Sequence, residues 1–103
     1  MNILYHAHHA TITPRMRQRI ERGLEKLEHR LGRSFDAAVL FEEDGPNRRV
    51  EIVAHLPRSR RFVADADGRF FGPVIVTSLM RLGAQLQHYK RTRKGRARRL
   101  ARV

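Results

Sequence analysis

The sequence predicts an α+β fold: a two-layer sandwich of order β-α-β-β-β-α, with two helices on one face of a four-stranded mixed sheet. Apolar residues recur with helical spacing in two segments, and three segments between them alternate apolar and polar residues as strands do. In addition, 41% of the 103 residues are apolar, the balance of a folded protein. A chain of this length forms one core, so we expect one domain over residues 1–89 and a basic, partly flexible tail over residues 90–103.

A strand and a helix come first. Residues 1–8 alternate apolar side chains between two faces, which favours a strand. Thr13 can cap a helix, and Pro14 suits the first helical position because the N–H that proline lacks would be unpaired there. Gly32 is a typical residue just past a helix end, so the helix is predicted over residues 14–31.

This helix separates its side chains into three faces. The apolar residues fall within an arc of about 80°: Met16, Ile20, Leu24, Leu27 and Leu31. The basic residues fall within another arc of about 80°: Arg15, Arg19, Arg22, Lys26, Arg30 and Arg33. The acidic residues Glu21, Glu25 and Glu28 occupy a third arc of about 60°. A solvated face usually mixes both signs in i, i+4 pairs, so the cationic stripe favours a binding face, with a solvated face as the alternative.

Three strands follow, over residues 35–42, 49–56 and 62–66, because apolar and polar residues alternate in each. Asp44-Gly45-Pro46-Asn47 supplies turn chemistry between the first two strands, which predicts a hairpin. Pro57 ends the second strand, and the turn after it carries Arg58, Arg60 and Arg61.

The last element is a helix that begins near Gly72-Pro73. Its apolar residues share an arc of about 80°: Ile75, Leu79, Leu82, Leu86 and Tyr89. Residues 74–77 also suit a strand, but the length of the pattern favours a helix. Eight of the fourteen residues after Tyr89 are basic, so we expect the helix to fray there. A helix between the first two strands implies a right-handed crossover, and both helices need the apolar face of the sheet.

Charge dominates the composition. The chain has 22 Lys and Arg against 10 Asp and Glu, a formal net charge of +12. Residues 1–67 carry a net charge of +2 and residues 68–103 a net charge of +10, with no acid in the second part. This imbalance indicates polyanionic partners. Arg greatly outnumbers Lys, which favours nucleic acid over a membrane surface, because guanidinium groups bind phosphate bidentately and stack on bases.

Other classes of protein are disfavoured. The chain has no cysteine, so it has neither a disulfide nor a thiolate metal site, and a reducing compartment fits. Its apolar runs are too short to span a membrane, and no secretory signal is visible. We therefore expect a cytoplasmic protein with no membrane partner, no cofactor and no small-molecule substrate.

The residues that invite a metal or catalytic hypothesis lack the rest of a site. His6, His8 and His9 could bind a metal, but no completing carboxylate set is evident, which favours polar strand-end or RNA-contacting histidines. Asp65 and Asp67 precede a glycine, as turn formers do. Nucleophile and base pairs and phosphate loops are also missing, so we predict that the protein is not an enzyme.

Three aromatic residues near the basic segment have two interpretations each. Phe70 and Phe71 are predicted as core anchors where the sheet meets the second helix, with stacking on unpaired bases as the alternative. Tyr89 shares the apolar stripe but adjoins Lys90 and Arg91, so both packing and RNA contact stay open.

A family resemblance covers nearly the whole chain. Ile12-Thr13-Pro14, Arg17-Gln18 and Lys26-Leu27-Glu28 resemble the first helix of the ribosome hibernation promoting factors, which include the ribosome-associated inhibitors. The second helix is similar through Gln85-Leu86 and on to Lys94-Gly95, although the four residues before it and the Arg-rich end depart from the family pattern. The resemblance is to the short type, without the C-terminal dimerisation domain of longer members.

The resemblance implies a function. Members of the family bind the small ribosomal subunit in the cleft that messenger and transfer RNA use, contact its rRNA and idle the ribosome during stress. We therefore expect a monomer whose partners are the small subunit and its rRNA. The predicted RNA-binding residues are Arg15, Arg19, Arg22, Lys26, Arg30, Arg33, Arg58, Arg60, Arg61, Arg81, Lys90, Arg91, Arg93 and Lys94.

Two other functions remain as alternatives. A general nucleic-acid-binding module would act through residues 90–103, because flexible basic arms bind duplexes without sequence preference. A protein–protein module would use the same charge to engage an acidic partner.

Overall fold

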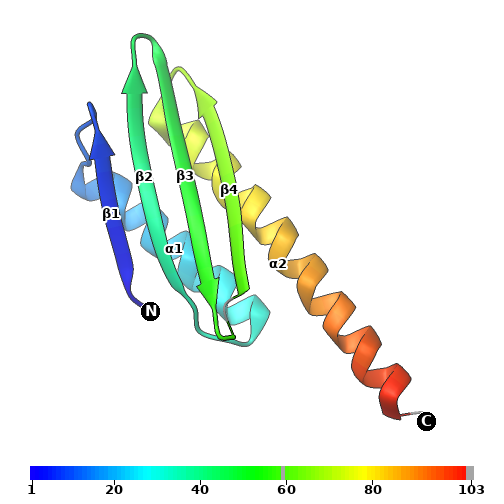
Figure 1. Ribbon diagram of the computed structural model, residues 1–103. Coiled ribbons are helices and arrows are strands. Elements are labelled where there is room, and N and C mark those ends of the chain that lie inside the picture. The colour runs from blue at the N-terminus through cyan, green and yellow to red at the C-terminus, as the bar shows by residue number, and fades with distance from the viewer. Residues whose placement is uncertain (59, 102–103) are drawn as a thin grey trace.

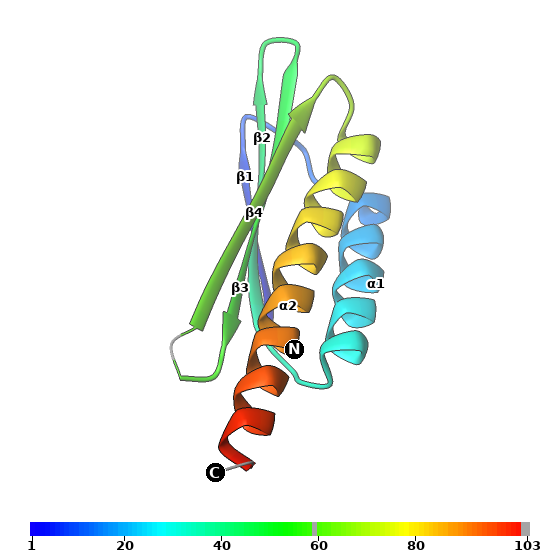
Figure 2. The same cartoon turned by 90° about the vertical axis from the view of Figure 1, so that its right-hand side faces the viewer.

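The computed structural model describes residues 1–58 and 60–101, with the elements β1 (Ile3–His8), α1 (Pro14–Leu31), β2 (Asp36–Asp44), β3 (Asn47–Leu56), β4 (Arg60–Gly68) and α2 (Phe71–Ala101). Figure 1 shows the four strands side by side with both helices behind them. The predicted order β-α-β-β-β-α is confirmed. Figure 2, turned by 90°, shows both helices on one face of the sheet, so the two-layer sandwich is confirmed as well.

The sheet is mixed and has the spatial order β1-β2-β3-β4. β1 and β2 run parallel and are joined through α1, whereas β2–β3 and β3–β4 are antiparallel. The register aligns Ala37 of β2 with Ala54 of β3, and Ala54 with Phe62 of β4. Because successive side chains of a strand point to opposite faces, these three residues lie on the same face of the sheet. Both helices cover that face, and the other face is open.

Helix α1 begins and ends where its capping residues predict. The Thr13 hydroxyl accepts a hydrogen bond from the Met16 amide at 3.2 Å, which pairs one of the free amides of the first turn. At the other end, Gly32 adopts the left-handed conformation with φ of 74° and donates its amide to the Glu28 carbonyl at 2.9 Å. These local signals explain why both ends of α1 were predictable.

The core lies between the sheet and the helices. Its largest fully buried side chains come from both layers: Ile20 and Leu24 of α1, Val39, Phe41, Val50 and Ile52 of the strands, and Ile75 and Leu82 of α2. Burial of each such side chain contributes about 1.5–3 kcal/mol, and no single element buries its apolar face without the others. The predicted apolar stripes of both helices are therefore core residues.

Two glycines let the helices approach closely. A Cβ atom on Gly23 of α1 would collide with the Leu79 side chain of α2, and one on Gly83 of α2 would lie 3.0 Å from Leu27 Cδ2. A larger residue at either position would require the facing leucine side chain to move. The surface between the two helices therefore depends on positions without a side chain.

Helix α2 decides between the two structures that residues 74–77 could form. These residues are helical rather than a strand, and the helix continues to Ala101, while the flexibility expected for residues 90–103 stays a prediction. The residues beyond Tyr89 are mainly Arg, Lys, Ala and Leu, which are strong helix formers, so charge alone does not unwind the backbone. Figure 1 shows this end of α2 running past the sheet. None of the described helices is long and apolar enough to cross a membrane.

The two phenylalanines before α2 have different environments. Phe71 is partly buried and packs edge-on against Phe41, with ring centroids 5.6 Å apart, as predicted for a core anchor. Phe70 is 70% exposed, so its predicted role as a core anchor is wrong. Its carbonyl accepts the Val74 amide at 3.4 Å at the first turn of α2, and only one of the two neighbouring rings faces the core.

Candidate nucleic-acid interface

The basic face of α1 lies on the side next to α2, away from β1. All of its members on the helix itself are exposed: Arg15, Arg19, Arg22, Lys26 and Arg30. The acidic face lies on the opposite side and makes contacts within the protein. Glu21 accepts from the Tyr5 hydroxyl at 3.4 Å, and Glu28 accepts from the Ser34 hydroxyl at 2.8 Å and the Phe35 amide at 3.0 Å. Glu21 and Glu28 are therefore used for contacts with other parts of the protein, which explains why the acidic residues of α1 lie on a face apart from the cations.

Tyr5 of β1 lies beside the acidic side of α1 and has a raised pKa. Burial and the neighbouring Glu21 carboxylate raise the pKa of Tyr5 to about 12, because both disfavour a second negative charge there. The Arg17 guanidinium lies 4.6 Å from the centre of the Tyr5 ring. Both charged neighbours of Tyr5 are thus engaged with β1 rather than with the face next to α2.

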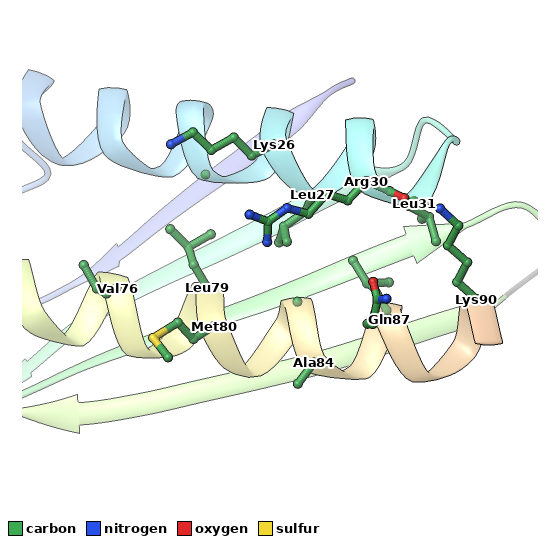
Figure 3. A pocket seen from close by; sticks show the side chains of 13 residues that line it. Lys26, Leu27, Arg30, Leu31, Val76, Leu79, Met80, Ala84, Gln87 and Lys90 are labelled. Atoms are coloured by element: carbon green, nitrogen blue, oxygen red, sulfur yellow. Dashed lines mark hydrogen bonds between the residues drawn. The ribbon is translucent and has the colours of Figure 1, made fainter. Parts of the chain in front are cut away.

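A groove runs between the two helices, with a volume of about 470 Å³ (Figure 3). Lys26 and Arg30 of α1 and Lys90 of α2 are among the residues that line it. The Lys90 ammonium donates to the Arg30 carbonyl at 2.5 Å, which ties α2 to the last turn of α1. The floor is apolar and includes Leu79 and the 69% exposed Met80. We call this the inter-helix groove.

Two further hollows contain predicted residues. Arg15 and Arg19 line one of about 410 Å³ beside Gly72 and Pro73, at the start of α2. A second, of about 500 Å³, opens where the end of α1, the β3–β4 turn and α2 meet. We call it the arginine cleft, and its cationic residues are Arg33, Arg58, Arg60 and Arg93. The described residues that line these two hollows and the inter-helix groove include no carboxylate. Arg33 also borders a further hollow, of about 410 Å³, whose lining includes Glu25 and Glu28.

Other predicted residues lie elsewhere. Arg61 faces the open side of the sheet, since its neighbour Phe62 packs against the core. Arg81 donates to the Asp65 carbonyl at 2.7 Å and lies along β4. Arg22 and Arg91 are exposed but line none of the three hollows, and the Lys94 side chain falls outside the described residues. The predicted set is therefore divided rather than continuous.

Two arginines that were not predicted as contacts are held by acids. Arg48 pairs with Glu43 at 2.9 Å, and Arg49 with Glu51 at 2.6 Å and with Asp65 at 3.3 Å. The hydrogen bond that the Arg49 guanidinium donates to Glu51 is the main reason that the pKa of Arg49 is raised above its usual value. Among the side chains that the structure describes, the arginine ion pairs involve only these two residues of β3.

Sequence reasoning missed the uncharged lining of the groove and the cleft. Val76 and Met80 are exposed on α2 at the groove, and His88 lines the arginine cleft. Val76 and Met80 fall outside the apolar arc of α2, so the helical wheel contained a signal that they face outward. His88 carried no such signal, because its neighbours in the cleft come from distant parts of the chain.

The N-terminal histidines do not assemble a ligand set. Across residues 1–58 and 60–101, no group of three or more His, Cys, Asp or Glu side chains is placed to hold a metal ion. His8 Nδ1 lies 3.5 Å from Glu42 Oε2, and the His8 and His9 rings are 4.3 Å apart. These contacts belong to the end of β1.

The fold and this surface define a small basic α+β protein whose helix layer carries exposed cations. The chain belongs to the family described as sigma 54 modulation protein and S30EA ribosomal protein, whose model matches residues 3–94. The family resemblance drawn from the sequence is thereby confirmed.

Solved structures agree with this assignment at the level of the fold. The N-terminal domain of Protein Y from Thermus thermophilus has a TM-score of 0.78 and 23% identity, covering 86% of this chain and 99% of that one. A ribosomal subunit interface protein from Coxiella burnetii has a TM-score of 0.74 and 21% identity, covering 87% of this chain and 98% of that one. No curated protein matches the chain in sequence.

Proposed function

We propose that the protein binds the rRNA of the small ribosomal subunit, in the cleft used by messenger and transfer RNA, and so idles the ribosome. Membership of a family that includes the S30EA ribosomal protein supports the ribosome as the partner, as does the likeness to a ribosomal subunit interface protein. In this proposal the protein acts as a monomer in the cytoplasm, and inhibition comes from occupying a site rather than from catalysis.

The observation that carries the proposal is the exposed cationic surface of the helix layer. Lys26, Arg30 and Lys90 line one groove, and no carboxylate is among its described lining residues. Phosphate oxygens would supply the missing anions, with release of the counterions around the RNA. Contacts of this kind give affinity and placement but little sequence readout, which suits a protein that follows the shape of a folded RNA.

A charge reversal tests the docking face. The double variant Lys26→Glu and Arg30→Glu should lose most co-sedimentation with small subunits, because two attractive contacts become repulsive. The matched control is Arg61→Glu with Arg69→Glu, which changes the net charge equally at exposed residues that line neither the inter-helix groove nor the arginine cleft. The control should keep its binding. Equal loss in both variants would mean that net charge, not the helix layer, governs association.

The general nucleic-acid module remains the second candidate, because α2 carries basic sequence past the sheet. Replacing Arg96, Arg98, Arg99 and Arg102 with Gln removes four of these charges while the residues of the groove and the cleft stay in place. Our proposal expects this variant to lose duplex DNA binding and to keep its preference for small subunits. Parallel loss on both ligands, with no remaining preference for small subunits, would favour the general module.

A further inference from the structure

The arginine cleft contains a concentration of positive charge that the packing of the domain does not explain. Arg33 follows α1, Arg58 lies in the β3–β4 turn, Arg60 begins β4 and Arg93 lies on α2, yet all four line one recess of about 500 Å³. None of them forms an ion pair among the described side chains. Guanidinium groups gathered in this way repel one another, and an anionic ligand would relieve the repulsion through charge-assisted hydrogen bonds.

An aromatic wall accompanies this charge. Tyr89 of α2 packs against Phe62 of β4, with ring centroids 5.4 Å apart, and both rings line the arginine cleft. The Arg60 guanidinium lies 5.7 Å from the centre of the Tyr89 ring. A planar aromatic ring beside a planar guanidinium is a surface on which nucleobases stack. The cleft therefore combines positive charge with aromatic side chains.

The backbone at the β3–β4 turn is also unusual. Arg58 has a φ of 67°, in the left-handed region that glycine and asparagine adopt more readily than arginine does. A long cationic side chain at this position costs the turn conformational free energy and serves no core contact, since Arg58 is exposed. A ligand bound to the Arg58 guanidinium would account for an arginine at this position.

We infer that the arginine cleft holds one unpaired nucleotide, with its phosphate on the guanidinium groups and its base against Tyr89. The volume lies within the range of about 300–1,000 Å³ that is usual for small organic ligands. This inference rests on the proposed function, which makes a single-stranded segment of rRNA one source of the nucleotide; a free nucleotide is the other.

Two competing ligands fit the cleft less well. A duplex keeps its bases stacked inside the helix, so it would use the arginines and leave the aromatic wall without a role. An acidic peptide would likewise satisfy the charges and gain nothing from a planar ring. The pairing of four arginines with Tyr89 and Phe62 favours a ligand that is both anionic and planar.

The full chain, labelled hexa-adenylate and fluorescence anisotropy test the inference. Unlabelled competitors are an RNA duplex of equal length, AMP, ATP and hexaglutamate. Tyr89→Leu should weaken hexa-adenylate binding by about tenfold, within the range measured for loss of one stacked base. Arg58→Gln, at an exposed turn, should weaken it too and leave the fold intact. Tyr89→Phe keeps the ring and should keep the affinity. Arg69→Gln should keep it as well, because Arg69 is exposed and lines neither the inter-helix groove nor the arginine cleft.

The outcomes separate the hypotheses. Competition by AMP or ATP that equals competition by the hexamer supports the site and identifies a free nucleotide as its ligand, whereas much stronger competition by the hexamer identifies RNA. Equal competition by duplex or hexaglutamate overturns the inference, and so does unchanged binding in Arg58→Gln and in a folded Tyr89→Leu. If the wild-type chain binds hexa-adenylate through Tyr89 but does not co-sediment with small subunits, the proposed function fails while the nucleotide site stands.

Discussion

The arginines of the helix layer and those of strand β3 are chemically identical but differ in their partners. Arg48 and Arg49 of β3 are held by Glu43, Glu51 and Asp65 at 2.6–3.3 Å. Arg30 of α1 faces a groove in which no carboxylate is among the described lining residues. The comparison teaches that net charge does not locate a binding surface. The useful signal is positive charge that the protein's own acids leave uncompensated.

The two helices pack closely at Gly23 and Gly83, so the first prediction tests whether the cationic surface depends on that packing. Gly23→Ala places a methyl group against Leu79, and this overpacking should cost about 1–3 kcal/mol. The helix propensity of alanine offsets up to about 1 kcal/mol of that cost, so the net effect should still be a lower free energy of unfolding. The displaced helices should also weaken binding to small subunits without any change in charge. Urea unfolding and co-sedimentation measure the two effects.

Glu25→Ala is the control for this variant, because Glu25 is exposed on the same helix. It should leave both the urea midpoint and subunit binding nearly unchanged. A Gly23→Ala protein as stable as the wild type would show that the two helices do not need their close approach.

The second prediction compares one arginine from each region. Arg30→Gln should reduce the slope of log affinity against log salt by roughly 0.7–0.9, the range for one phosphate contact on single strands and duplexes, and leave the free energy of unfolding unchanged. Arg49→Gln should leave that slope unchanged and lower the free energy of unfolding by about 0.5–1 kcal/mol, because partly exposed ion pairs contribute little. Titrations at several salt concentrations, paired with urea unfolding, check both. The reverse pattern would mean that β3 and not α1 contacts the RNA.

The smallest expected effect concerns the acidic side of α1. The pKa of Tyr5 rises to about 12 in the folded protein, from 10.0, so the folded state holds this proton more tightly than the unfolded state. The resulting stabilisation is complete below pH 10 and is lost as the pH rises through about 12. Tyr5→Phe should therefore flatten the fall in stability over this interval and leave RNA binding unchanged. Urea unfolding at pH 9, 10 and 11 measures it, and an unaltered pH profile would contradict the assignment.

Local signals made much of the fold predictable. Both ends of α1 depend on neighbouring residues, Thr13 and Gly32, and the alternation in the strands identified which side chains enter the core. Prediction failed at Phe70, which is 70% exposed, whereas its neighbour Phe71 packs against Phe41.

The candidate site was predictable only in part. The cationic stripe of α1 came from the helical wheel, and strand parity could also have separated Arg61 from Arg60, since Phe62 marks the inward side. The arginine cleft could not be predicted, because Arg33, Arg58 and Arg93 meet only after the chain has folded. The Arg81 contact with the β4 backbone likewise depends on how α2 lies on the sheet.

The claim that the helix layer, and not the open face of the sheet, contacts rRNA can be tested by site-specific crosslinking. A photoreactive amino acid at Gln87, which lines the inter-helix groove, is compared with one at Val63, which is 40% exposed on β4. With small ribosomal subunits, the account predicts crosslinks to rRNA from position 87 and few or none from position 63. Strong crosslinks from position 63 and none from position 87 would contradict it.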